Sequence, residues 1–305
     1  MNRAFFGKKR NVVIAAILYT FMWGCAFPLV KLCLKSFMID DADNISKCML
    51  AGIRFFLSGI LTLSCCRFLG ERPLLKLSHL KFVTIYGILA TFMQYAFTYI
   101  GLSRVDGSKG AVFDQSCVFM IIIFSGIFFK NDMLNFKKIT GCVLGFIGVS
   151  VINIDKIDFD FKLNGEGLLI CAALCQTAAY FIAKYSAEKI PAVKLVGYGQ
   201  LIGGSFLFIF SCIFGGKIAS VNSGGILCMI MLIIISSAAY VLSLMPLKYF
   251  PASEISSFNL LITVFGVIMS GIILGENIFK LNYAASLALI CAGILFVNGR
   301  THYDR

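Results

Sequence analysis

Ten apolar segments, separated by short polar connections, run through the whole chain. Each is about 18–24 residues long, and an α-helix needs roughly 20 residues to cross a hydrocarbon core of about 30 Å. Helices satisfy all their backbone hydrogen bonds inside lipid, which open strands cannot do. The pattern predicts an all-α integral membrane protein with ten transmembrane helices, near residues 11–32, 45–68, 79–100, 106–129, 136–153, 165–184, 191–214, 225–247, 251–274 and 280–299.

Part of this pattern occurs twice. Residues 101–153 and 246–298 align without a gap at an offset of 145, and identical pairs include Phe113 with Phe258 and Gly148 with Gly293. The offset contains five spans. An odd number of spans turns the second copy upside down in the membrane relative to the first.

The repeat therefore predicts two inverted five-helix units, residues 1–153 and 154–305. Inverted pairs of this kind enclose a central site near the bilayer midplane and suit alternating access. Small residues at four-residue spacing predict close helix contacts. These are Gly141 with Gly145 on the fifth span and Gly199 with Gly203 on the seventh.

Lysine and arginine set the direction of the spans. With the N-terminus inside, 17 of the 27 Lys and Arg residues fall in inner connections or tails and 8 in outer connections. Cytoplasmic loops carry the excess of basic residues. The bias predicts a multi-pass protein of the cell membrane with both termini cytoplasmic.

Composition narrows the class further. Hydrophobic residues make up 59% of the chain and charged residues 14%, against roughly 25% charged residues in soluble domains. The net charge is +12, and the basic residues lie between the apolar segments, where they can contact anionic lipid headgroups. We therefore expect the lipid bilayer as a partner, and not nucleic acid. The twelve cysteines form no C-x-x-C pair, and we expect no disulfide, metal or other cofactor.

Several motifs resemble the EamA family of the drug/metabolite transporter superfamily, over essentially the whole chain. The resemblance rests on Trp23, Gly24, Phe27, Pro28, Lys31, Arg54, Phe55, the run from Leu247 through Pro251 to Glu276, and Ala292 to Ile294. It implies ten helices around a central cavity, lined mainly by spans 1, 3, 4, 6, 8 and 9, and transport of small metabolites. Two family prolines are replaced by Val118 and Thr263, so bending of those spans at proline is not expected.

Polar groups inside a bilayer are costly and mark sites of function. Asp114 is the only carboxylate deep within a predicted span. It could bind a proton or a cationic substrate group, or it could be held by Arg54 or nearby hydroxyls. The other cavity candidates are Gln115, Trp23, Gln94, Gln176, Tyr240 and Asn259, with Tyr95 and Tyr180 as weaker ones.

Three of these positions carry alternatives. Asn259 aligns with Asp114 in the repeat and could line the cavity or join two helices. Arg54, in the second span, could attract anionic groups, extend toward the surface or lock two helices together, and we favour the structural role. Lys31 is expected to extend to the outer surface, and Glu276 to cap the next helix or pair with a neighbouring lysine.

The sequence thus predicts a secondary transporter of a small metabolite, such as an amino acid or related compound, working by alternating access and possibly in export. Because no phosphate-binding loop for ATP is present, transport would use a proton or sodium gradient, or the gradient of the substrate itself. The alternative is an intramembrane lipid-modifying enzyme, which would need clustered His, Asp or Glu residues near an interface. A passive channel is a third class. We expect the protein to be a monomer or a homodimer.

Overall fold

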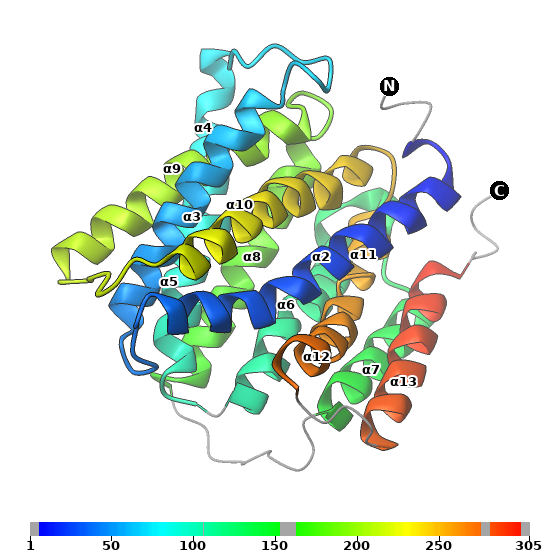
Figure 1. Cartoon of the computed structure of the whole chain (residues 1–305). Helices are drawn as coiled ribbons and strands as arrows, with labels where there is room; N and C mark the ends of the chain where they lie inside the picture. Colours follow the sequence, from blue (N-terminus) through cyan, green and yellow to red (C-terminus); the bar gives the residue numbers. More distant parts are fainter. Residues whose placement is uncertain (1–5, 106, 153–162, 276–280, 300–305) are drawn as a thin grey trace.

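The computed structural model describes residues 6–105, 107–152, 163–275 and 281–299, and these are folded into helices joined by short connections (Figure 1). The elements are α2 (Lys9–Ser36), α3 (Asn44–Ser64), η1 (Leu77–His79), α4 (Leu80–Gly87), η2 (Ile88–Met93), α5 (Gln94–Leu102), α6 (Gly107–Phe128), η3 (Lys130–Asp132), α7 (Phe136–Ile152), α8 (Glu166–Ser186), α9 (Ala192–Ile213), α10 (Ser223–Leu244), η5 (Met245–Lys248), α11 (Ala252–Ser257), α12 (Leu260–Leu274) and α13 (Leu281–Asn298).

Within the described residues, seven helices are long and apolar enough to cross a bilayer. Their outward surfaces are apolar too, as on α10, where Ile226, Ile230 and Ile234 are exposed. Two shorter apolar helices, Phe113–Phe128 and Asn282–Asn298, lie where the fourth and tenth spans are expected. The helical, multi-pass character of the chain agrees with the sequence, and the number of ten crossings stays a prediction.

The third predicted span, 79–100, is a composite element. A 3₁₀ turn leads into α4, the π-helical turn η2 follows, and α5 completes the crossing. Its backbone approaches α9 closely, because a Cβ added to Gly203 would lie 2.2 Å from the Gly87 carbonyl oxygen. A Cβ added to Gly199 would likewise lie 2.5 Å from a carbon of the Tyr86 ring. The predicted contact role of Gly199 and Gly203 is confirmed.

The ninth predicted span, 251–274, is divided into α11 and α12 at Phe258 and Asn259. No proline stands at the break, as the replaced family position predicted. Instead the backbone tightens locally, with the Asn259 N–H donating to the Ser256 carbonyl at 2.9 Å. The Tyr19 hydroxyl of α2 lies 2.9 Å from Asn259 Oδ1 and 3.3 Å from the Ile255 carbonyl oxygen, so α2 bridges the two pieces.

Helices from the two halves of the chain pack in cross pairs. α3 lies along α9, and α7 lies along α13 (Figure 1). α2 packs on α10 and α12, while α8 packs on α5 and α6. Exchanging the halves therefore converts one set of these contacts into the other. The glycines of α7 serve this packing, since a Cβ on Gly141 would lie 2.7 Å from the Gly293 carbonyl oxygen.

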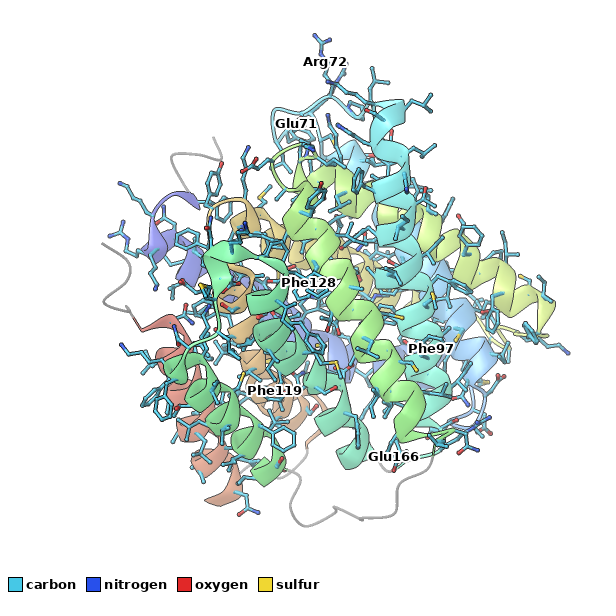
Figure 2. The ribbon with its side chains drawn as sticks, turned by 180° about the vertical axis from the view of Figure 1, so that it is seen from behind. Glu71, Arg72, Phe97, Phe119, Phe128 and Glu166 are labelled. Atoms are coloured by element: carbon cyan, nitrogen blue, oxygen red, sulfur yellow. The ribbon has the colours of Figure 1, made fainter. Side chains whose placement is uncertain are left out.

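The bundle has two ends. At what we call the N-terminal end, Lys9 Nζ donates to the Asn298 carbonyl at 3.0 Å, and Lys194 pairs with Glu71 at 3.3 Å. The opposite, distal end holds the start of α8 at Glu166. Figure 2 shows Glu71 and Glu166 at these opposite ends. α2 and α8, the first helices of the two halves, thus begin at different ends of the bundle.

Candidate functional site

A cluster of aromatic side chains and one arginine lies where α2, α3, α5 and α10 meet. The Trp23 and Tyr240 rings make an edge contact with centroids 4.9 Å apart, and the Tyr240 hydroxyl is 3.3 Å from that of Tyr95. Phe55 packs on Tyr95 at 4.4 Å. We call Trp23, Arg54, Phe55, Tyr95 and Tyr240 the central cluster. The structure therefore brings together Trp23 and Tyr240, two of the predicted cavity residues.

Arg54 occupies the centre of this cluster. Only 4% of the residue is exposed, so the guanidinium does not extend to a surface. Its Nε donates to Ser236 Oγ at 2.7 Å, and its guanidinium carbon lies 5.0 Å from the Phe55 ring centre and 5.8 Å from that of Trp23. Its terminal nitrogen Nη2 has no hydrogen-bond partner within the described residues. The two N–H donors of Nη2 on this buried cation are thus left unused.

The space beside Arg54 is small and mainly apolar. Its volume is about 10 Å³, which leaves room for roughly one water molecule. The walls come from α2, α3, α5 and α10. They include Val30, Cys33, Leu50, Tyr99 and Leu232. The structure therefore holds this part of the bundle closed.

Asp114 is half-buried on α6. Its charge acts on the hydroxyls of both Tyr95 and Tyr240, and so does the charge of Arg54. No ion pair joins Asp114 to Arg54, both of which the structure describes. The expected alternative that Arg54 holds Asp114 directly is therefore not what the structure contains. Both charged groups are instead within electrostatic range of the same two tyrosines.

Two of the predicted glutamines are buried with an unused acceptor. Gln94 on α5 is 7% exposed and Gln115 on α6 is 6% exposed. The side-chain oxygen of each lacks a hydrogen-bond partner in the part of the chain that the structure describes. The hydroxyl of Tyr180 on α8 shares this condition. Buried polar atoms are normally satisfied, so these groups are available to a bound molecule.

The remaining candidates are placed differently. Gln176 is half-buried on α8 and makes no hydrogen bond to the central cluster within the described residues. Asn259 bonds to Tyr19 across the α2–α12 contact, which is the helix-joining alternative of its two predicted roles. Lys31 is exposed on α2, in agreement with its expected extension to a surface. Glu276 lies outside the described residues.

Sequence reasoning missed a second buried charge, Asp132. It follows α6 and is 2% exposed. Lys138 Nζ donates to it at 2.5 Å, the Ser253 N–H donates at 2.8 Å, and the Ser253 hydroxyl donates as well. The connection after α6 is thereby fastened to the start of α11. Nothing in the local sequence separates Asp132 from a solvated loop aspartate, since its partner Ser253 is 121 residues away.

A wider crevice opens at the N-terminal end of the bundle. Its volume is about 280 Å³. Its polar walls come from the connections after α3, α8 and α10, and include Glu71, Glu188, Lys189 and Lys248. Within the described residues no group of three or more His, Cys, Asp and Glu side chains could hold a metal ion. The chemistry on offer is therefore recognition by charge, hydrogen bonds and aromatic faces.

Known proteins resemble the chain along nearly its whole length. An uncharacterized transporter of Bacillus subtilis, YvbV, is 24% identical over 96% of this chain and 93% of its own. A protein of Salmonella typhimurium described as a probable amino-acid metabolite efflux pump is 24% identical over 93% of both chains. One solved crystal structure matches the fold with a TM-score of 0.76, at 14% identity, over 95% of this chain and 98% of that one.

The family comparison agrees with the repeat seen in the sequence. The profile of the EamA-like transporter family matches twice, at residues 10–154 and 163–299. The two matches together take in every described helix. The chain therefore belongs to the EamA-like transporter family and is a multi-pass membrane transporter.

Proposed function

We propose that the protein is a secondary transporter of a small amphoteric metabolite, an amino acid or a related compound, across the cell membrane. The observation that carries this proposal is the central cluster. Helices of both family repeats meet there around a buried cation with an unused donor. A site built from both halves can change its exposure when the halves rock against each other.

The proposed mechanism is alternating access by two inverted repeats, residues 1–153 and 154–305. Two observations support it. The first helices of the two halves begin at opposite ends of the bundle, and the cross contacts are reciprocal. The space beside Arg54 is too small for a substrate, and the wider crevice lies at the N-terminal end. The charge bias of the connections makes the N-terminal end cytoplasmic in this scheme.

The substrate class follows from the buried groups. A cation at Arg54, a carboxylate at Asp114 and unused acceptors on Gln94 and Gln115 match a molecule that carries both charges. The Salmonella relative is described as an amino-acid metabolite efflux pump, which supports the same class and favours export. Coupling would use a proton or a sodium ion, with Asp114 as the group that binds it.

Counterflow tests this proposal. Purified protein in liposomes, preloaded with an unlabelled mixture of amino acids, should accumulate labelled amino acids from outside, and protein-free liposomes should not. Asp114→Asn should abolish this exchange or remove its dependence on pH, while the protein still inserts. Conversion of a lipid substrate without any counterflow would favour the alternative, an intramembrane lipid-modifying enzyme.

A matched control separates the role of Asp114 from a general effect of charge. Asp41 is an exposed aspartate in a predicted outer connection. Asp41→Asn removes the same charge and should leave counterflow unchanged. Equal loss in both variants would count against a specific role for Asp114.

A further inference from the structure

We propose that Arg54 binds the carboxylate of the transported substrate, at a closed subsite between α2, α3, α5 and α10. This inference rests on the proposed function and assigns its recognition step to one side chain. The resemblance alone implied a cavity lined mainly by other spans than the second. The contacts of Arg54 place it in the central cluster instead.

The first argument is the hydrogen-bond balance of the guanidinium. Nε is satisfied by Ser236, whereas Nη2 is buried without a partner. No carboxylate pairs with this cation among the described residues. An arginine that served only to join helices would be expected to use its donors, because an unpaired buried charge is strongly unfavourable. An incoming carboxylate would neutralise the charge and use the free donors, since it can accept two parallel hydrogen bonds from the guanidinium group.

The second argument is how the side chain is held. Phe55 and Trp23 present their rings to the guanidinium, and the Nε bond to Ser236 fixes its plane. Ser236 in turn donates to the Leu232 carbonyl at 2.8 Å. A cation held by two rings and one hydrogen bond, with its terminal Nη2 donors free, is prepared for a ligand, because little side-chain entropy remains to be lost on binding.

The third argument concerns which anion fits. Asp114 lies within electrostatic range of the same two tyrosines as Arg54. A phosphate group carries a charge of about −1.5 to −2 at neutral pH and would be repelled by that carboxylate. A carboxylate with an ammonium group nearby carries no net charge, so it escapes this repulsion. The walls formed by Val30, Leu50 and Leu232 suit an apolar side chain.

The small volume beside Arg54 sets a condition on access. About 10 Å³ cannot hold an amino acid, so the ring contacts of the central cluster must part when the substrate enters. Trp23 touches Tyr240 and lies under the guanidinium. Trp23 is also the one tryptophan of the chain. Its fluorescence therefore reports on this subsite without any label.

The experiment is a titration of Trp23 emission in the purified full-length protein. The probes are L-leucine, L-threonine and L-methionine, each compared with its carboxamide, which keeps the ammonium group and side chain but lacks the carboxylate. We expect at least one acid to change the emission, and its amide to bind about 30-fold more weakly or worse, as for other buried charge pairs that lose a partner. Arg54→Gln should remove the preference for the acid.

Two further variants control for folding and for charge. Arg54→Lys keeps the charge without the planar fork, and should retain part of the preference in protein that remains monodisperse. Lys31→Gln removes an exposed cation of the same helix as Trp23 and should change nothing. The proposal is overturned if acids and amides act alike, if Arg54→Gln keeps the preference, or if no probe changes the emission of wild-type protein.

Counterflow in liposomes separates this failure from failure of the proposed function. Amino-acid exchange with no discrimination between acid and amide would overturn the role of Arg54 and leave the transporter proposal intact. Acid-selective binding at Trp23 with no counterflow of any amino acid would overturn the transporter proposal and leave carboxylate binding by Arg54 intact.

Discussion

Asp132 and Arg54 are both buried charges, and the protein treats them in opposite ways. Asp132 has a cation and two further donors around it, from Lys138 and Ser253. Arg54 has one hydroxyl, two aromatic faces and a terminal nitrogen without a partner in the described part of the chain. Both residues are almost fully removed from solvent.

The difference separates structure from recognition. A buried charge that is fully paired cannot bind a ligand as well, because every lone pair or proton is already used in a hydrogen bond. A buried charge with an open donor costs stability in the free protein and gains it back when a partner arrives. The comparison therefore predicts that mutation of Asp132 will mainly lower stability, and that mutation of Arg54 will mainly weaken ligand binding.

Asp132→Asn should give the largest loss of stability. It leaves the Lys138 ammonium buried without a counter-charge, beside the Met133 carbonyl at 3.0 Å, and breaking a buried pair in this way costs about 3–5 kcal/mol. The measurement is unfolding in mixed detergent micelles. The exposed Asp41→Asn is the matched control and should change stability by less than about 0.5 kcal/mol. A loss under about 1 kcal/mol at Asp132 would mean that the pair is solvated.

Tyr19→Phe tests a neutral buried contact against the charged ones. The hydroxyl bridges Asn259 and the Ile255 carbonyl at the break between α11 and α12. Removing it should cost about 1–3 kcal/mol, because Asn259 and Ile255 lose a buried donor. Hydrogen exchange at the amides around residues 255–260 should rise in the same variant. Unchanged exchange there would show that α2 does not hold the break.

The sequence predicted the elements of this fold well because the requirement that creates them is local. Any span must carry about 20 apolar residues in a row, and that is visible in one dimension. The break in the ninth span was not visible, because it depends on Tyr19 from a helix more than 200 residues away. The π-helical turn in the third span was missed for a similar reason, since it lies against the glycines of α9.

The candidate site was predicted in part. Asp114, Trp23 and Tyr240 stand out because charged or aromatic polar groups are rare at the middle of a span, and the structure brings the rings of Trp23 and Tyr240 into contact. Arg54 was assigned a structural role because a lone arginine has several uses in a membrane. Only its contacts showed that the Nη2 donors are free. Gln176 shows the limit of the rule, since a polar residue in a span need not reach the cluster.

Asp43→Ala should have a small, pH-dependent effect. Asp43 caps α3, where it accepts from the Ser46 N–H at 2.9 Å and the Ser46 hydroxyl at 2.6 Å. Partial burial raises the pKa of Asp43, but the hydrogen bonds from Ser46 outweigh it and hold the pKa below its ordinary value. A depressed pKa stabilises the fold above the unfolded value of about 3.9.

The loss on Asp43→Ala should therefore be about 1 kcal/mol at pH 7, and it should vanish as the pH falls through the folded pKa of this carboxyl. Unfolding of both proteins at neutral and acidic pH measures it. A loss that persists unchanged in acid would mean that packing, and not the charge of the cap, is responsible.

Arg54→Met should change stability least of all. It removes the charge and keeps an apolar side chain of similar length in contact with Phe55 and Trp23. No partner is stranded, because Ser236 keeps its bond to the Leu232 carbonyl. The lost Nε bond and the relieved burial of an incompletely paired cation act in opposite directions, so unfolding should stay within about 1 kcal/mol of the wild type. The same protein should lose acid-selective binding at Trp23. A drop of about 3 kcal/mol or more would place Arg54 beside Asp132 as a structural charge, and the contrast between the two sites would then fail.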